Sequence, residues 1–204
     1  DVCSSDLIEE DDFVPTLVDR IKRQIEPVEV PPEKAPVKEV ILKGKDADLT
    51  QIPALWHAER DPSPYIASGM AIIKDPETGI RNMSIHRQQI QGPDQTGFLI
   101  CPRHALRVYQ KYQQRNEPMP VAMVIGAHPA IYYASGFTSS YGLDELEIAG
   151  SLLDDPVRLV KCETIDIEVP AEAEMVIEGE VLPDGMVEEG PFGEATGTYA
   201  MEGS

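Results

Sequence analysis

Two strand-like runs joined by a short turn are the feature that most constrains the fold of this chain. Tyr65–Lys74 and Arg81–Ile90 are rich in apolar residues, and Asp75-Pro-Glu-Thr-Gly79 stands between them. Proline and glycine supply the dihedral angles that a tight turn needs. A connection this short joins antiparallel neighbours, because parallel strands need a crossover of a dozen or more residues. We therefore expect a β-hairpin in this part of the chain.

Helix-like and strand-like segments follow one another irregularly along the rest of the chain. Pro102 suits the first turn of a helix, where its missing N–H is not needed. The mixture of hairpins and helices indicates an α+β domain built on an antiparallel sheet or barrel. The predicted strands are 96–101, 120–126, 157–169 and 175–182, and the predicted helices are 102–116, 128–135 and 143–153.

The first 45 residues have a different character. Apolar residues at roughly helical spacing from Leu17 to Ile25 predict a short amphipathic helix that Pro27 ends. Residues 26–36 contain four prolines and read as an extended linker. We place a domain boundary near residue 45, so that residues 1–45 form a partial N-terminal region and residues 46–204 form the main domain. The start at Asp1 and the end at Ser204 lead us to expect a piece of a longer protein.

Charge and composition exclude several classes of function. The 36 acidic residues against 17 Lys and Arg give a net charge of -19, which repels phosphate backbones and anionic membrane surfaces. We therefore expect no nucleic-acid partner. No apolar run approaches the ~20 residues of a spanning helix, and no signal peptide opens the chain, so we expect a soluble, cytoplasmic protein. An odd number of widely spaced cysteines, Cys3, Cys101 and Cys162, favours reduced thiols.

Four segments place polar side chains beside apolar strand residues: 81–87, 101–104, 160–164 and 188–194. Strand alternation puts Asn82, Ser84 and His86 on one face. A solvated polar face explains this spacing as well as a site does, and from spacing alone it is the better explanation. His104, near a helix start, reads equally well as a surface histidine.

Glu163 fits a surface position less well. It follows a largely apolar run, where a carboxylate usually has a cation or a metal as its partner. An Asn, a His and a Glu together would suit manganese or magnesium. Nothing in the spacing brings Asn82, His104 and Glu163 together, so the residues alone leave a metal site open.

The segment Glu189-Gly-Pro-Phe-Gly-Glu194 carries a carboxylate at each end. Its glycines and proline hold the backbone in an unusual path and so set the relation between the two acids. The segment is either a polar turn between strands or a pair of carboxylates with different tasks. In the second case one acid is a charged partner and the other is a proton donor.

At these same segments the chain resembles the UbiD-type decarboxylase family. The resemblance runs from about Val37 to Tyr199, and its most specific parts are 81–87, 160–164 and 189–194. It implies that the main domain is a split β-barrel that binds flavin. It also implies that the tail of a small N-terminal α/β domain precedes this barrel, and that the family's large C-terminal domain is absent from the chain.

The resemblance implies a role for individual residues. Asn82, His104 and Glu163 match the ligands of a divalent metal, expected to be manganese, that holds the cofactor phosphate. Arg87, Glu189 and Glu194 match a catalytic network in which Arg87 pairs with the substrate carboxylate or holds Glu189, and Glu194 is the acid. Potassium is a further ion that the resemblance allows. The segments that surround prenylated FMN match Ser84, Ile85, His86, Arg87, Phe98, Leu99, Ile100 and Arg103.

The activity implied is reversible, non-oxidative decarboxylation of an aromatic, heteroaromatic or α,β-unsaturated acid. A flavin prenyltransferase would supply the cofactor, and the full-length protein would be a homo-oligomer. The chain departs from the family at Thr138, where a proline usually stands, and His104 matches the ferulic-type branch but not the ubiquinone-pathway branch. We expect the piece alone to lack turnover and to expose an apolar patch where the missing domain docks.

Two other functions compete with this one. An ordinary flavin-dependent oxidoreductase can share the barrel, but it would need no metal on the phosphate. A non-catalytic paralogous subunit can share the fold, but it would have no use for Arg87, Glu189 and Glu194. A hydride-transfer assay with a nicotinamide cofactor distinguishes the oxidoreductase from a decarboxylase. Metal analysis distinguishes the non-catalytic subunit from a decarboxylase.

Overall fold

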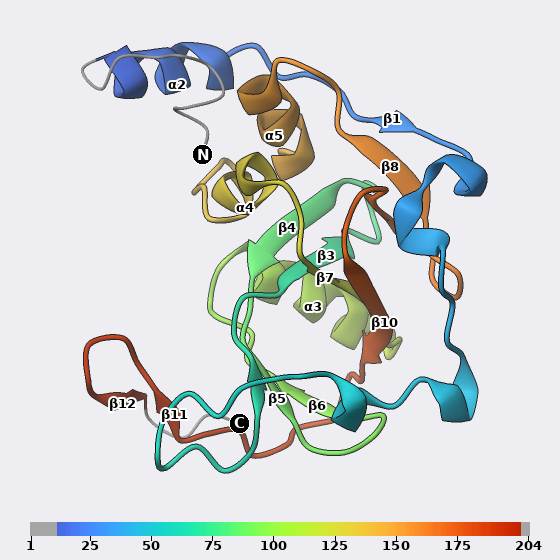
Figure 1. The fold of residues 1–204 in the computed structure, drawn as a ribbon, viewed down its shortest axis with the longest axis vertical. Coiled ribbons are helices and arrows are strands. Elements are labelled where there is room, and N and C mark those ends of the chain that lie inside the picture. Colours follow the sequence, from blue (N-terminus) through green and yellow to red (C-terminus); the bar gives the residue numbers. More distant parts are fainter. Residues whose placement is uncertain (1–11, 201–204) are drawn as a thin grey trace.

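A four-stranded antiparallel sheet forms the centre of the computed structural model, which describes residues 12–200 (Figure 1). Its strand order is β10-β7-β3-β4. The expected hairpin is confirmed, because β3 pairs with β4 from Met70 opposite Ile85 to Lys74 opposite Arg81. Gly79 in the connecting turn has a φ of 71°, which favours glycine. The strands are β3 (Met70–Lys74), β4 (Arg81–Ile85), β7 (Met119–Ile125) and β10 (Met175–Val181).

A second antiparallel sheet lies below the first in Figure 1, in the order β2-β5-β6. Each of the two runs that form the predicted hairpin therefore contributes one strand to each of the two sheets. Residues 65–74 form β2 and β3, and residues 81–90 form β4 and β5, with His86 in the crossing where its N–H donates to the Gly69 carbonyl. The strands are β2 (Tyr65–Ile66), β5 (Gln88–Ile90) and β6 (Thr96–Phe98).

The proline-rich stretch joins a third sheet, in the order β1-β8-β9. Strand β1 (Val28–Glu29) runs parallel to β8 (Arg158–Lys161), and β9 (Glu168–Pro170) pairs antiparallel with β8. Beyond β1 the chain makes 3₁₀ turns at Pro32–Lys34, Pro36–Lys38, Gly44–Asp46 and Leu49–Gln51. The stretch is thus a short strand followed by 3₁₀ turns and not an extended linker throughout, and the domain boundary near residue 45 stays a prediction. Near the other end, β11 (Phe192–Gly193) pairs with β12 (Tyr199–Ala200).

The predicted helices are confirmed, with ends that shift by a few residues. Asp144 caps α5, since its carboxylate accepts the N–H of Leu146, and a proline opens α4. The N-terminal helix ends at Ile21, ahead of Pro27, so it is shorter than expected. The helices are α2 (Phe13–Ile21), α3 (His104–Arg115), α4 (Pro129–Ser135) and α5 (Glu145–Leu153).

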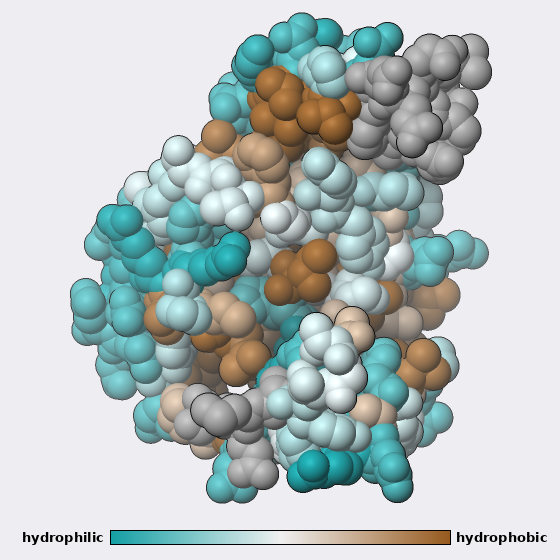
Figure 2. Space-filling model, turned by 90° about the vertical axis from the view of Figure 1, so that its left-hand side faces the viewer, coloured by the Kyte–Doolittle hydropathy of each residue, from teal (hydrophilic) through white to brown (hydrophobic). Residues whose placement is uncertain are grey.

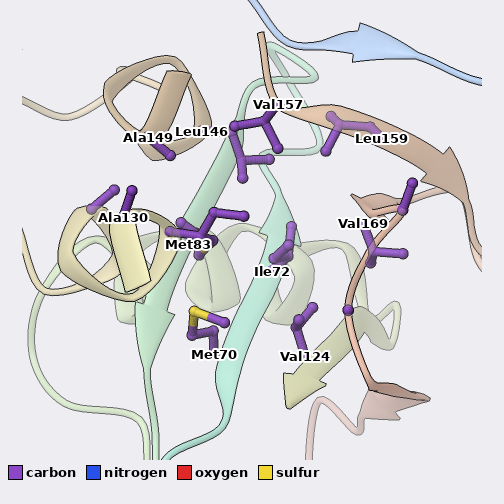
Figure 3. Close-up of a cluster of buried hydrophobic side chains, with 14 of the residues drawn as sticks. Met70, Ile72, Met83, Val124, Ala130, Leu146, Ala149, Val157, Leu159 and Val169 are labelled. Carbon is purple, nitrogen blue, oxygen red and sulfur yellow. The ribbon is translucent and has the colours of Figure 1, made fainter. Parts of the chain in front are cut away.

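Apolar side chains fill both faces of the central sheet, because successive strand residues point to opposite sides. On one face Ile72 and Met83 meet Leu146 of α5, together with residues of α4, β8 and β9 (Figure 3). On the other face Ile73 packs with Val108 of α3. The described residues thus form a mixed fold of helices and mainly antiparallel sheets, in agreement with the α+β prediction.

The surface is mainly hydrophilic, with separate hydrophobic patches on the face that Figure 2 shows. Exposed apolar residues include the neighbours Leu55 and Trp56 and the consecutive residues Val40, Ile41 and Leu42. None of the helices within residues 12–200 has the length and apolar character needed to cross a membrane.

Candidate functional site

The structure brings together Arg87, Glu189 and Glu194, as the sequence predicts. The Arg87 guanidinium donates to both carboxylate oxygens of Glu189, from Nε at 3.0 Å and from Nη2 at 2.8 Å. Such a two-pronged contact holds an acid more rigidly than a single bond does. Nη1 reaches Glu194 at 3.3 Å. The Glu189 side chain is 4% exposed and that of Glu194 is 45% exposed, so one acid is locked and the other is open.

Backbone contacts hold the turn that carries the two acids. Gly190 has a φ of 103°, which favours glycine, and its peptide bond to Pro191 is cis. The Gly190 N–H donates to the Gln89 side chain at 3.3 Å, and the Gly193 N–H donates to Asp61 at 3.0 Å. Phe192, between the acids, lies with its ring 4.8 Å from the Arg87 guanidinium. The turn therefore places the two carboxylates on one arginine.

Tyr65 of β2 belongs to the same group, although nothing distinguishes it in sequence from the apolar run in which it lies. Its ring packs edge-on against Phe192 at 4.8 Å, and the residue is only 1% exposed. The hydroxyl has no partner in hydrogen-bonding geometry. Burial raises the pKa of Tyr65, and the nearby charge of Glu189 raises it further. A neutral phenol therefore stands close to the locked acid.

A second polar group joins β4 to the start of α5. The Asn82 amide nitrogen donates to Glu145 at 3.1 Å and 3.3 Å, and the Met83 N–H donates to the same carboxylate at 2.8 Å. Ser139 adds a hydroxyl donor at 3.0 Å. The Asn82 side-chain oxygen is buried and has no partner. His104 and Asn82 line the same small cavity, which Glu145 does not line.

Glu145 is the residue that sequence reasoning missed. An acid in the first turn of a helix usually faces solvent and favours the helix dipole, so its position carried no sign of a site. Here it is 2% exposed, and burial raises its pKa. Arg81 holds the preceding residue, Asp144, with a contact of 2.7 Å. This contact and the cap on α5 place Glu145 against the edge of β4.

The structure pairs Glu163 with two lysines, and its place in the predicted metal set with Asn82 and His104 stays a prediction. Strand β8 ends at Lys161, so Glu163 lies in the following turn instead of on an apolar strand. Its carboxylate pairs with Lys43 at 2.8 Å and with Lys38 at 3.0 Å, and these two contacts lower its pKa. Two lysines are thus the cationic partners of Glu163 in this structure.

The residues expected around the flavin fall into two groups. Phe98, Leu99 and Ile100 line a cavity of about 870 Å³ that also reaches Glu189. Ser84, Ile85 and His86 lie at the end of β4, and none of them lines this cavity. Buried His86 contacts the Ser84 hydroxyl and the Leu99 carbonyl, each at 2.8 Å, and so ties the two groups together. The Arg103 guanidinium contacts Thr138 at 3.4 Å.

The fold and these groups define a mixed helix-and-sheet protein in which a locked acid and an open acid share an arginine at the edge of a large cavity. The UbiD family model, described as the 3-octaprenyl-4-hydroxybenzoate carboxy-lyase Rift-related domain, matches residues 28–204. The chain therefore belongs to the UbiD family.

Two of the similar proteins are decarboxylases by name, and another is a UbiD-class enzyme. Anhydromevalonate phosphate decarboxylase of Methanothermobacter thermautotrophicus is 40% identical over 75% of this chain and 36% of its own length. The UbiD-class enzyme HmfF of Pelotomaculum thermopropionicum, in an evolved dimeric form with prFMN, matches with a TM-score of 0.94 and 42% identity, over 98% of this chain and 47% of that one. Vanillic acid decarboxylase of Sedimentibacter hydroxybenzoicus matches at 0.90 and 30% identity, over 96% and 43%. The chain thus spans less than half the length of these relatives.

Proposed function

We propose that this chain is the cofactor- and metal-holding part of a decarboxylase that removes carbon dioxide from an aromatic, heteroaromatic or α,β-unsaturated acid. The single observation that carries the proposal is the Arg87 guanidinium shared between buried Glu189 and open Glu194. Family membership and the named relatives support it. In this proposal the β10-β7-β3-β4 and β2-β5-β6 sheets are parts of a split flavin-binding barrel.

Each residue of the group has a separate task in this reaction. Glu189, which lines the cavity and is held by two bonds, would fix Arg87 beside it, where the guanidinium would receive a substrate carboxylate. Glu194 has one longer contact and access to solvent, so it can deliver the proton that replaces carbon dioxide. Prenylated FMN, when bound, would supply the carbon centre that activates the acid for loss of carbon dioxide.

A divalent metal fits the Asn82 group better than it fits the set predicted from sequence. Within residues 12–200 no three His, Cys, Asp or Glu side chains form a group that could hold a metal, and the site that we propose includes the amide oxygen of Asn82. The buried Asn82 oxygen lacks a partner, and His104, which lines the same small cavity, would add one nitrogen. Glu145, which accepts from the Asn82 amide nitrogen, would add one carboxylate. This donor set suits manganese or magnesium. The metal would hold the cofactor phosphate.

The same proposal implies how the cofactor is supplied, which further ion is involved and how the complete protein assembles. A flavin prenyltransferase would supply the cofactor in the cytoplasm, potassium would be a further ion, and the complete protein would form homo-oligomers. A flavin-dependent oxidoreductase remains the competing function, because a flavin cavity alone would serve both chemistries.

Turnover by the complete protein tests the proposal. The protein would be reconstituted with prenylated FMN and manganese and incubated with a panel of aromatic and α,β-unsaturated acids, and carbon dioxide release would be measured. We expect release from at least one acid and none with unmodified FMN. Hydride transfer from a nicotinamide cofactor without carbon dioxide release would instead establish the oxidoreductase.

A further inference from the structure

Glu194 owes little of its position to contacts of its own side chain. The carboxylate has one contact with Arg87, at 3.3 Å, and the side chain is 45% exposed. The backbone of the β11–β12 hairpin therefore places it, since Glu194 directly follows β11. The Glu194 N–H donates to the Thr198 carbonyl at 2.8 Å and closes the turn of this hairpin. The neighbouring Gly193 N–H donates outside the hairpin, to Asp61.

Asp61 is buried and accepts three backbone hydrogen bonds. The residue is 4% exposed. Oδ2 accepts from the N–H groups of His57 and Ala58, at 3.0 Å and 2.9 Å, and Oδ1 accepts from Gly193 at 3.0 Å. Hydrogen bonds to a charged acceptor are stronger than those to a neutral one. One oxygen thus shapes the segment 57–61, and the other attaches this segment to β11.

The segment 57–61 also packs closely against the hairpin. A β-carbon added to Gly193 would lie 2.3 Å from the Ala58 β-carbon, so there is no room for a side chain between the two. On the other strand of the hairpin, the Tyr199 hydroxyl accepts from the Arg60 N–H at 3.0 Å. The Arg60 guanidinium lies 4.9 Å from the centre of the Tyr199 ring. The segment therefore contacts both strands of the hairpin that carries Glu194.

We propose that Asp61 is a positioning residue for Glu194. By holding the Gly193 N–H, its carboxylate fixes the backbone from which the Glu194 side chain reaches Arg87. Asp61 acts through the hairpin and does not itself donate a proton. This inference rests on the proposed function for the role of Glu194 as the proton donor.

The variant Asp61→Asn separates the tasks of the two carboxylate oxygens. An amide has one oxygen that accepts and one NH₂ group that donates. The oxygen should face the pair of N–H groups from His57 and Ala58, because two bonds are made there. The NH₂ group then meets the Gly193 N–H, and two donors cannot bond. Asp61→Asn therefore keeps the shape of the segment 57–61 and releases the hairpin.

Amide hydrogen exchange, measured by NMR in the 204-residue chain, tests this attachment without an assay of activity. The Gly193 amide should exchange about 10-fold faster in Asp61→Asn than in wild type, as expected for the loss of a hydrogen bond to a charged group. Asp48→Asn is the matched control, because Asp48 caps another turn with Thr50 and Gln51 as its partners. An unchanged Gly193 rate in Asp61→Asn would overturn the proposal.

Turnover of the complete protein tests the effect on Glu194. With an acid that the wild type decarboxylates, Asp61→Asn should lower kcat by ~10- to 100-fold, because a small displacement of a catalytic group is costly. KM should stay the same, because Arg87 and Glu189 keep their mutual contact. In the Glu194→Gln background the same change should cause no further loss, since no proton donor remains to be positioned.

The outcomes separate this inference from the proposed function. Equal losses of kcat from Asp61→Asn in both backgrounds would show a structural role only and overturn the inference. An unchanged kcat in Asp61→Asn, with a wild type that turns over, would defeat this inference alone. If the wild type releases no carbon dioxide from any acid, the proposed function fails, and the Gly193 exchange rate still decides whether Asp61 holds the hairpin.

Discussion

At the residue scale, the carboxylates of Glu145 and Glu163 have different neighbours. Glu145 is buried against Asn82, whereas Glu163 is paired with two lysines. We predict that Glu145→Gln weakens Mn²⁺ binding by ~10-fold or more, because an amide replaces the charged ligand, and that Glu163→Gln leaves it unchanged. Electron paramagnetic resonance of free Mn²⁺ measures this in the complete protein. Equal affinities for the two variants would remove Glu145 from the site.

Buried hydroxyls differ in whether they are paired, and this decides what their removal does. The Tyr65 hydroxyl has no partner, while the Tyr109 hydroxyl donates to the Leu182 carbonyl at 2.8 Å. Tyr65→Phe should change the free energy of unfolding by less than about 0.5 kcal/mol, and Tyr109→Phe should lower it by about 1 kcal/mol. Urea unfolding followed by circular dichroism measures both. A larger loss for Tyr65→Phe would indicate that the phenol donates to Glu189 in solution.

The residues of the candidate site could be predicted from sequence where one short motif contains them. Glu189 and Glu194 flank one turn, and both reach Arg87 as expected. Glu163 was expected at the end of an apolar strand but lies beyond β8, because an apolar run does not reveal where its strand ends. Glu145 was missed because its burial depends on packing between α5 and β4, which lie far apart in the sequence.

At the scale of elements, Asp75 ties the β3–β4 turn to α3. It accepts from the Glu77 N–H at 2.9 Å, from Lys111 at 2.7 Å and from the Tyr141 hydroxyl. Burial alone would raise the pKa of Asp75, but the bonds from Lys111 and Tyr141 lower it from 3.8 to about 2. A depressed pKa adds stability that is present above pH 3.8 and is lost as the pH falls to about 2.

We therefore predict that Asp75→Asn destabilises the protein at neutral pH. The difference in free energy of unfolding from wild type should shrink as the pH falls from about 4 to about 2. Denaturant unfolding at a series of pH values measures it, with Asp46→Asn as an exposed control. A difference that stays constant across this range would show that the Asp75 carboxylate does not stabilise the fold through its charge.

Local patterns predicted the existence of elements better than their pairing. Strands β7 and β10 and helix α3 lie where apolar spacing placed them. The runs 65–74 and 81–90 look continuous in sequence, yet each bends and contributes to two sheets. Alternation marks which residues share a face, but it does not mark where a strand leaves one sheet for the next.

For the whole molecule, the packing of both faces of the central sheet determines stability. Leu146 is fully buried against β3 and β4, whereas Leu42 is 60% exposed (Figure 3). Leu146→Ala should lower the free energy of unfolding by about 2–5 kcal/mol, and Leu42→Ala by less than about 0.5 kcal/mol. Chemical denaturation compares the two. Similar small losses would mean that this face of the sheet is not a packed core.

The arrangement of the sheets around the cavity could not be predicted from local sequence. Its lining includes residues from 44 to 189, and contacts of such separation leave no periodic pattern. The α+β class followed from the order of elements, whereas the barrel assignment came from the family resemblance. Several motifs that match the family in the same order support the barrel assignment more strongly than any single motif does.

Turnover of Glu194→Gln in the complete protein, reconstituted with prenylated FMN, tests the central claim most directly. The amide keeps the shape of the side chain but has no proton to transfer, so we predict a loss of ~100-fold or more in carbon dioxide release. Glu188→Gln, an exposed neighbour, should retain activity. Absorbance would confirm equal flavin content. Near-normal turnover of Glu194→Gln at full cofactor loading would contradict the account, because the open acid would then not be the proton donor.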